Sequence, residues 1–184
     1  MKTLLEFWQS QHRVRSKDEP LTPTDFAQGI GEMIGKSFRR VLDIGCAVGR
    51  DTLFFASKGH VVTGLDISPT AVEIAGINAL KWNLQNNVKY ISCGISELVL
   101  PRKVFDLIYA RTSLHYFADP KLNDIIKQLI EALSFDGVVA VQLRSVFDEK
   151  YGKGIPLSEE IFVDEEGHIR RFLVEGQPKS YLAV

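Results

Sequence analysis

The segment that decides the fold is residues 41–50, which read Val41-Leu42-Asp43-Ile44-Gly45-Cys46-Ala47-Val48-Gly49-Arg50. Its first four residues form a short, mostly apolar run, which predicts a buried strand. The two glycines that follow allow the backbone to come close to a ligand, and a helix-like stretch begins at Asp51. The first amides of such a helix offer hydrogen-bond donors to a polar group. The segment therefore predicts a strand, a ligand-binding turn and a helix.

The glycine spacing in this turn argues against a dinucleotide cofactor. The dinucleotide fingerprint G-x-G-x-x-G would need glycines at positions 45, 47 and 50, but the sequence has Ala47 and Arg50 at two of them. The chain also lacks a Tyr-x-x-x-Lys pair. A nicotinamide-dependent oxidoreductase is therefore disfavoured, and the remaining pattern is an acid, Asp43, followed by spaced small residues.

Strand-like and helix-like segments alternate along the rest of the chain. Apolar runs predict further strands at 61–67, 88–92, 105–110 and 138–143. Helical periodicity and capping residues predict helices at 26–34, 51–58, 70–82 and 121–133. Thr22-Pro23-Thr24-Asp25 and Ser68-Pro69 are the predicted caps of the first and third of these helices, and Asp136-Gly137 predicts a turn before the last strand. This alternation predicts a doubly wound α/β fold with a parallel sheet covered on both faces. A ligand should then bind beyond the carboxyl ends of the strands.

The composition fits one soluble domain. The 184 residues are 45% hydrophobic and 24% charged, with a net charge of −1. This balance provides no general attraction to nucleic acid or to an anionic membrane, and no window approaches the roughly 18 apolar residues of a membrane span. Cys46 and Cys93 have neither a metal-binding nor a redox spacing. We therefore expect a cytoplasmic protein without a metal site.

The loop motif and the strand pattern together resemble the class I S-adenosylmethionine-dependent methyltransferases, whose first motif is hDhGxGxG. The resemblance covers about residues 22–145, with Ala47 in place of the middle glycine. It implies a Rossmann-like sheet of strand order 3-2-1-4-5. It also implies S-adenosylmethionine as cofactor and S-adenosylhomocysteine as product. The residues expected to bind the cofactor at the loop are Asp43, Gly45, Cys46, Ala47, Gly49 and Arg50.

Later positions complete the cofactor site that the resemblance implies. Asp66 ends the second strand, where a carboxylate accepts both ribose hydroxyls; the alternative is that it only caps the following helix. Ile67 would lie against the adenine. Many relatives have an aspartate after the third strand that accepts the adenine amino group, but this chain has Gly94 there. Ile95 and Ser96 are then expected to contact the adenine edge.

The stretch after the fourth strand is expected to face the methionine half of the cofactor and the methyl acceptor. In the family, backbone carbonyls here hold the cofactor's ammonium group, which assigns this role to Ala110 and Arg111. His115 and Tyr116 are candidates for positioning or deprotonating the acceptor. The alternative is that both only begin an aromatic helix that packs on the sheet.

The two ends of the chain carry the clues to the substrate. Trp8 lies in a region that forms a lid in small-molecule methyltransferases of the tellurite-resistance and thiopurine types. There it would cover an apolar acceptor or only anchor a helix. The basic residues of the tail would either surround an anionic acceptor or form a solvated strand; they are Arg144, His168, Arg170 and Arg171. We expect one domain over residues 1–184, with a helical lid at 1–38, a cofactor-binding core at 39–145 and a substrate-side tail at 146–184.

The tail is shorter than the family pattern. The usual fold adds an antiparallel hairpin of strands six and seven, but only about forty residues follow Leu143. We expect that hairpin to be missing or shortened, with a weak hairpin near 165–167 and a helix beginning at 181–184. The fifth strand would then be an open edge, available to a homodimer. The chain is either naturally short or part of a longer protein.

The sequence therefore predicts a methyltransferase that transfers the methyl group of S-adenosylmethionine directly to a small molecule, with an anionic acceptor as one option. An activated sulfonium needs mainly alignment with its acceptor, so the absence of a catalytic triad does not count against this function. The alternative is a protein that binds the cofactor or its product without catalysis. Gly94 and the short tail favour that alternative.

Overall fold

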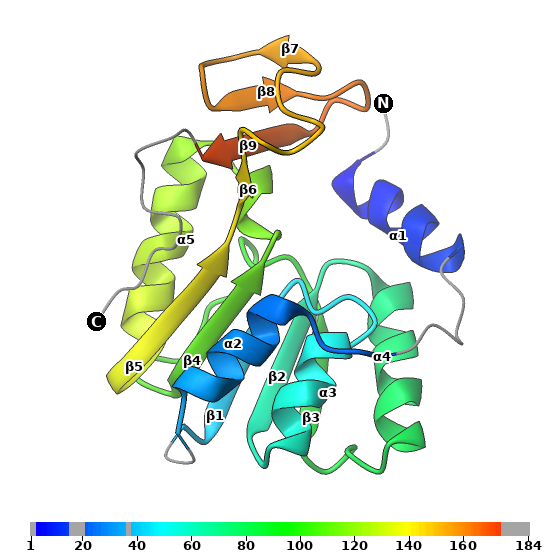
Figure 1. Ribbon diagram of the computed structural model, residues 1–184, viewed down its shortest axis with the longest axis vertical. Helices are drawn as coiled ribbons and strands as arrows, with labels where there is room; N and C mark the ends of the chain where they lie inside the picture. The colour runs from blue at the N-terminus through cyan, green and yellow to red at the C-terminus, as the bar shows by residue number, and fades with distance from the viewer. Residues whose placement is uncertain (1–2, 15–20, 36–37, 174–184) are drawn as a thin grey trace.

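The computed structural model describes residues 3–14, 21–35 and 38–173. A parallel five-stranded sheet in the order β3-β2-β1-β4-β5 forms its centre (Figure 1). Its strands are β1 (Arg40–Ile44), β2 (Val61–Asp66), β3 (Val88–Ser92), β4 (Phe105–Arg111) and β5 (Leu133–Gln142). The predicted doubly wound fold and its strand order are confirmed.

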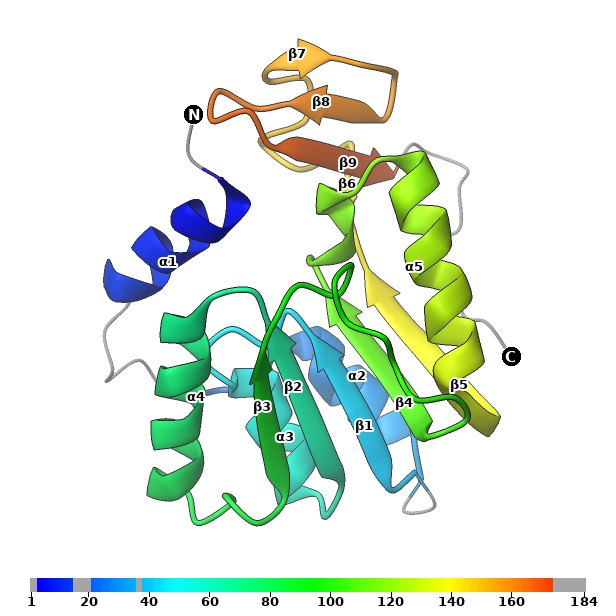
Figure 2. The same cartoon turned by 180° about the vertical axis from the view of Figure 1, so that it is seen from behind.

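Helices cover both faces of this sheet, as the opposite views in Figures 1 and 2 show. The elements are α2 (Asp25–Met33) and α3 (Arg50–Ser57) on one face, α4 (Pro69–Lys81) beside β3, and α5 (Asp119–Ala132) on the other face. Two predicted caps are present, because the Thr24 hydroxyl accepts the Ala27 amide and the Ser68 hydroxyl accepts the Ala71 amide. In the described part of the chain, every helix is too short or too polar to cross a membrane.

The alternation of side chains along β1 places its acid away from the main core. Ile44 packs into the apolar core that includes α5, whereas Asp43 points to the opposite face. There the Thr52 hydroxyl of α3 donates to the Asp43 carboxylate at 2.6 Å. Ile44 also pairs with Leu65 of β2 and Ala110 of β4, so the carboxyl ends of three strands meet at one edge. This edge carries the loops that build the site.

β5 begins earlier than the sequence predicts. We expected a turn at Asp136-Gly137 and a strand from residue 138, but the strand starts at Leu133, directly after α5. The pairing with β4 shifts register in this stretch, and Asp136 has a φ of 61°. The turn-forming pair is therefore an irregularity inside the strand, as in a β-bulge.

A second, smaller sheet lies above the carboxyl ends of the main sheet (Figure 1). Its strands, in the spatial order β6-β9-β8-β7, are β6 (Arg144–Ser145), β9 (Ile169–Leu173), β8 (Ile161–Val163) and β7 (Ile155–Pro156). The hairpin predicted near 165–167 joins β8 and β9. The tail thus builds a separate sheet, and β5 has no neighbour on its outer side within the described residues. The helix predicted at 181–184 lies outside those residues, and a homodimer through β5 stays a prediction.

α1 (Leu4–Val14) bridges the second sheet and α4 (Figures 1 and 2). Near its start, the Phe7 ring lies 5.1 Å from the His168 ring, and the Arg170 guanidinium lies 5.8 Å from the centre of the Phe7 ring. Further along, α1 packs on α4. We refer to α1 and the second sheet together as the roof, because both lie over the carboxyl ends of the main sheet.

Candidate functional site

A cavity of about 620 Å³ lies between the roof and the carboxyl ends of the strands. It extends from the ends of β2 and β3 to the ends of β4 and β5, where a doubly wound fold binds its ligand. We call it the main cavity. Its walls combine apolar side chains with a few polar groups, which is typical of small-molecule sites. The residues from the strand ends and following loops are Ile44, Gly45, Ala47, Leu65, Asp66, Ile67, Cys93, Gly94, Ile95, Arg111, Thr112, Ser113, Gln142 and Leu143.

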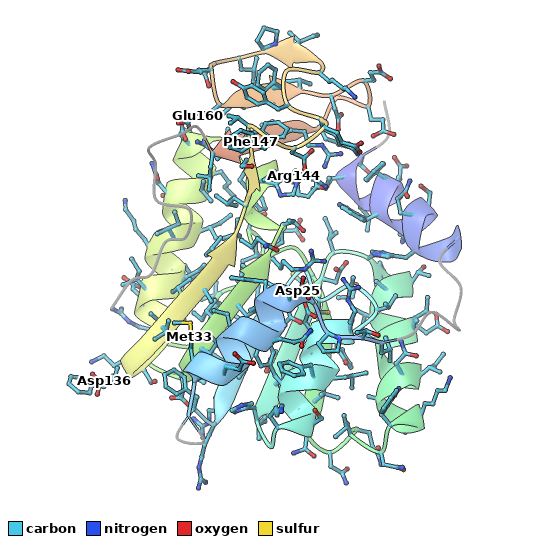
Figure 3. All side chains as sticks on the ribbon, in the orientation of Figure 1. Asp25, Met33, Asp136, Arg144, Phe147 and Glu160 are labelled. Carbon is cyan, nitrogen blue, oxygen red and sulfur yellow. The ribbon has the colours of Figure 1, made fainter. Side chains whose placement is uncertain are left out.

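The remaining wall of the main cavity comes from the roof and the segment after β4. This wall consists of Leu4, Trp8, His12, Tyr116, Phe117, Arg144, Ser145, Phe147 and Asp148. The three α1 residues are spaced four apart, so they form one stripe along a single helical face. Figure 3 shows Arg144 and Phe147 close together where the second sheet meets the main sheet. Trp8 lines the main cavity from α1, and its role as a lid residue stays a prediction.

The turn after β1 adopts a conformation that its small residues permit. Gly45 and Gly49 have φ values of 80° and 86°, and Ala47 has a φ of 48°. The left-handed region costs a residue with a Cβ about 1–2 kcal/mol. At Gly45, an added Cβ would lie 2.6 Å from the Cβ of Ser113. The glycines thus allow close packing within the protein as well as close approach of a ligand.

Asp66 fixes this turn and also faces the main cavity. One carboxylate oxygen accepts the amide of Ala47 at 2.9 Å, and the other accepts the amide of Ser68 at 2.9 Å. Burial raises the pKa of Asp66, although these two amides and nearby His12 act in the opposite direction. Each carboxylate oxygen has a second lone pair for a further donor. Asp66 therefore orders the start of α4 and keeps acceptor capacity for a ligand diol.

Asp43 lies on a second, smaller cavity of about 160 Å³ behind the turn. Gly45, Ala47 and Arg111 line both cavities, so the two adjoin. The other residues of the small cavity are Leu21, Asp43, Cys46, Val48, Arg50, Asp51 and Tyr109. The Asp43 side chain is almost fully enclosed, at 2% exposure. Burial raises the pKa of Asp43 to about 7, against the hydrogen bond from Thr52.

Asp51 organises the small cavity and was not among the predicted site residues. Its carboxylate accepts the Tyr109 hydroxyl and the Thr24 hydroxyl, each at 2.9 Å, and lies 3.5 Å from Arg111 Nε. It also accepts the Thr24 amide, which joins the start of α2 to the start of α3. Its position in the first turn of a predicted helix was the only signal in the sequence.

The other predicted cofactor residues divide between the wall and the interior. Ile67, Gly94 and Ile95 line the main cavity next to Asp66, as predicted. Three predicted residues line neither cavity, namely Gly49, Ser96 and Ala110. Ala110 is fully buried in β4, and the Ser96 carbonyl accepts a hydrogen bond from Lys121 Nζ at 3.3 Å. The backbone of Ala110 pairs with β1 and β5. Of the two residues expected to hold the ammonium group, Ala110 and Arg111, only Arg111 lines the main cavity.

His115 and Tyr116 are adjacent residues of the short 3-10 helix η1 (Leu114–Tyr116), and they lie in different surroundings. Tyr116 lines the main cavity, whereas His115 is fully buried and lines neither cavity. Burial, together with the nearby charges of Arg144 and Arg170, lowers the pKa of His115 to about 3. His115 is therefore a neutral, enclosed ring that packs 4.1 Å from Tyr116. The predicted acceptor contact of His115 does not occur in this arrangement, because Tyr116 takes the cavity-facing position.

The predicted basic cluster of the tail does not assemble around the main cavity. Arg144 lines it, but His168, Arg170 and Arg171 do not. Arg170 forms an ion pair with Asp164 at 2.7 Å, and Arg171 pairs with Asp119 and Glu160. These carboxylates hold the two arginines within the second sheet and against α5.

The turn between β8 and β9 brings three potential metal ligands together. Asp164, Glu166 and His168 offer atoms within 4.8 Å of one another. Asp164 already accepts the amides of Glu166 and His168 at one oxygen and the Arg170 guanidinium at the other. A cation would therefore compete with an arginine at 2.7 Å, so this cluster is better explained as a structured turn.

Comparison with known proteins places the chain in a family. Residues 41–137 match the family described as "Methyltransferase domain". This match covers more than half of the chain, and the chain therefore belongs to that family. S-Adenosylmethionine is the cofactor of this class of domain, and the five-stranded sheet with its glycine turn is the fold on which it binds.

Individual relatives support the same assignment. The 27-O-demethylrifamycin SV methyltransferase of Amycolatopsis mediterranei is 37% identical over 103 residues, which are 55% of this chain and 37% of that protein. A solved S-adenosylmethionine-dependent methyltransferase from Methanosarcina mazei has a TM-score of 0.64 at 26% identity, covering 79% of this chain and 78% of its own. The phosphoethanolamine N-methyltransferase 1 of Haemonchus contortus, solved with phosphoethanolamine and S-adenosylhomocysteine, has a TM-score of 0.69 and covers 90% and 36%; at 19% identity this is a likeness of fold.

The match spans between 27% and 56% of the length of the first curated relatives. Those relatives therefore contain further segments beyond the region they share with this chain. The tellurite-resistance or thiopurine subtype stays a prediction.

Proposed function

We propose that this chain binds S-adenosylmethionine in the main cavity and transfers its methyl group to a small molecule held under the roof. The observation that carries this proposal is the continuity of the main cavity. One space connects the diol-accepting carboxylate of Asp66 with the aromatic and polar residues near Tyr116. Such continuity is required because the acceptor must reach the methyl group in line with its sulfur.

The proposed orientation of the cofactor follows from the chemistry of the wall. Asp66 accepts the ribose hydroxyls, and Ile67 and Ile95 pack against the adenine. The methionine end then points to Gly45 and Arg111, which adjoin the small cavity. Arg111 suits the carboxylate of the methionine, and the acids Asp43 and Asp51 provide a negative environment for its ammonium group.

The cofactor supplies an activated methyl group on a positively charged sulfur. The protein's part in the reaction is mainly to align the acceptor and to exclude water. Trp8 covers the cavity from α1 and contacts the Tyr116 ring edge-on at 5.9 Å. Thr112, Ser113 and Gln142 supply polar groups where the strands end. A base is needed only if the acceptor carries a proton, and Asp148 is the carboxylate at the acceptor end of the wall.

Titration calorimetry with S-adenosylhomocysteine tests the binding step. Asp66→Asn keeps an acceptor oxygen for the turn but removes the negative charge. We expect its affinity to fall by about 5- to 150-fold, which corresponds to the 1–3 kcal/mol of a charge-assisted bond. Asp124→Asn, on the exposed side of α5, is the matched control and should bind as the parent does. No binding by the parent, or an unchanged affinity of Asp66→Asn, would contradict the proposed site.

Binding without catalysis is the second candidate, and the burial of His115 favours it. With this imidazole enclosed and its pKa low, the acceptor end lacks the histidine base that the sequence suggested. Release of S-adenosylhomocysteine from S-adenosylmethionine, followed over a panel of thiols, phenols and amines, separates the two candidates. Turnover with any member of the panel supports methyl transfer, whereas cofactor binding without turnover across the panel supports the binding role.

A further inference from the structure

Tyr116 is held at the junction of three elements. It belongs to η1, its ring meets Trp8 of α1, and its hydroxyl oxygen accepts a hydrogen bond from Arg170 of β9. The Arg170 guanidinium also lies 4.6 Å from the centre of the Tyr116 ring and 5.8 Å from that of Phe7. Asp164 accepts two further nitrogens of Arg170, at 2.8 and 2.7 Å. Asp164 and the two aromatic rings therefore hold the Arg170 guanidinium in place, and its hydrogen bond orients the Tyr116 hydroxyl.

The direction of this hydrogen bond determines what Tyr116 offers to a ligand. An arginine can only donate, so the phenol oxygen must accept from Arg170. The hydrogen of the Tyr116 hydroxyl then points away from the guanidinium, and the side chain lines the main cavity. Burial raises the pKa of Tyr116 although Arg170 acts against it, so the hydroxyl keeps its proton near neutral pH. Tyr116 is thus a hydrogen-bond donor toward the acceptor end.

The charges around the acceptor end are matched inside the protein. Arg144 donates to Asp148 at 2.5 Å, and Arg170 and Arg171 have the carboxylate partners described above. One nitrogen of Arg144, Nε, has no hydrogen-bond partner among the described residues, but the positive charge of Arg144 is already balanced by Asp148. A strongly charged acceptor therefore finds no uncompensated opposite charge among these arginines, and burying an unpaired charge is costly. A positively charged acceptor meets the same difficulty at Asp148.

Apolar side chains form much of the remaining acceptor end, beside the polar groups of Thr112, Ser113 and Gln142. Leu4, Trp8, Phe117 and Leu143 line it, and Phe147 stands at its mouth with 82% of its surface exposed. Apolar and aromatic side chains with a few placed polar groups are the usual lining of a small-molecule site. Aromatic walls also favour a planar ring, which stacks on them or meets their edges.

We propose that the methyl acceptor is an uncharged, largely apolar ring compound with a carbonyl or hydroxyl oxygen that accepts a hydrogen bond from Tyr116. Arg170 acts as a positioning residue, because it orients the Tyr116 hydroxyl without touching the ligand. This inference rests on the proposed function, since it concerns the acceptor end of the same cavity. It also removes the anionic acceptors that the sequence left open.

Three probes with one hydroxyphenyl ring isolate the effect of charge. They are 4-hydroxyacetophenone, which is neutral at pH 6.5, 4-hydroxybenzoate, which is an anion, and tyramine, which is a cation. Each is titrated calorimetrically into the full chain saturated with S-adenosylhomocysteine. We expect the neutral probe to bind at least about tenfold more tightly than either charged one, a difference of roughly 1.4 kcal/mol.

Variants then test the role of Tyr116. Tyr116→Phe keeps the ring and should weaken the neutral probe by about 3- to 10-fold, the effect expected for one neutral hydrogen bond. Tyr151→Phe is the matched control, because its hydroxyl donates to the Glu159 carbonyl at 3.3 Å, in the second sheet. Arg170→Met should reproduce the loss, and Arg170→Lys, which keeps a donor and a charge, should restore part of it.

The outcomes separate this inference from the proposed function. If S-adenosylhomocysteine does not bind, the proposed function fails. If it binds but a charged probe binds as tightly as the neutral one, or no probe binds, the acceptor class proposed here is wrong. If Tyr116→Phe binds the neutral probe as the parent does, the hydrogen bond from Tyr116 is wrong. Equal loss in Arg170→Met and Arg170→Lys would mean that Arg170 only supports the fold.

Discussion

Asp43 places an acid in the protein interior, and its removal tests whether that acid costs stability. In the parent, the Thr52 hydroxyl donates to Asp43 at 2.6 Å. The Asp43→Asn variant keeps an oxygen that can accept this hydrogen bond, and it removes the charge. Burial raises the pKa of Asp43 from 3.8 to about 7. This shift of about three pKa units corresponds to roughly 4 kcal/mol, at about 1.4 kcal/mol for each unit. We therefore expect a gain of roughly 3–5 kcal/mol at high pH.

The sign and the pH range of this gain follow from proton binding. Between pH 4 and 7 the unfolded chain has already released the Asp43 proton, while the folded protein still holds it. The folded parent then binds more protons than the unfolded chain, so its stability falls as the pH rises. The free energy of unfolding of Asp43→Asn should therefore exceed that of the parent by an amount that grows by up to about 1.4 kcal/mol per pH unit. Above pH 7 the difference should be constant.

Urea unfolding of both proteins at half-unit steps from pH 4.5 to 8.5 measures this difference directly. Titrating groups distant from Asp43 affect both proteins alike and cancel in the comparison. Asp124→Asn, on the exposed side of α5, controls for the loss of one negative charge. A difference between Asp43→Asn and the parent that does not change with pH would refute the assignment of Asp43 as a buried, largely protonated acid. A lower stability of the variant at every pH would do the same.

Three further predictions concern the same turn. In the parent, the affinity for S-adenosylmethionine should rise between pH 6 and 7.5, because ionised Asp43 attracts the cationic cofactor. The rise should be up to about tenfold per pH unit, and calorimetry should find a weaker dependence of affinity on pH in Asp43→Asn. Ala47→Gly should raise the free energy of unfolding by about 0.5–1 kcal/mol, since Ala47 has a φ of 48°; an unchanged urea midpoint would contradict strain at this residue. Gly45→Ala should lower the free energy of unfolding, measured with urea, by about 2–4 kcal/mol, because residue 45 has a φ of 80° and its new Cβ would lie 2.6 Å from that of Ser113. In the control Gly76→Ala, in α4, the new Cβ meets no atom within 4 Å, so this change should be neutral or stabilising.

The part of the fold that local rules determine was predictable from the sequence. The strand at 41–44, the cap at Ser68 and the alternation of strands with helices depend on neighbouring residues, and each was found where it was expected. The exception at β5 has a long-range cause. Asp136-Gly137 is a turn signal by local rules, but pairing with β4 holds the chain extended on both sides of it. Tertiary pairing thus outweighs the local preference at this point.

The cofactor end of the site was predictable because its residues are close together in sequence or follow consecutive strands. Asp66 supports Ala47 across 19 positions, and the parallel register of β1 and β2 sets that distance. The acceptor end was not predictable in the same way. Its decisive contact joins Tyr116 of η1 to Arg170 of β9 across 54 positions. From the sequence, the tail arginines either surrounded an anionic acceptor or formed a solvated strand, and their carboxylate partners were not identified.

This difference explains why we propose an uncharged acceptor, whereas the sequence had left an anionic acceptor open. A charged side chain is weaker evidence for a charged ligand when a partner within the protein already neutralises it. Asp164, Asp119 and Glu160 are unremarkable acids in the sequence, yet each is the partner of a tail arginine. Because these acids pair with the arginines, the group at the cavity wall that remains to bind an acceptor is the phenol of Tyr116, beside apolar side chains. On the α1 side, Leu4, Trp8 and His12 line the cavity, and their spacing of four residues places all three on one helical face. Of these three residues, the sequence had indicated only Trp8, as a cover for an apolar acceptor or an anchor for a helix.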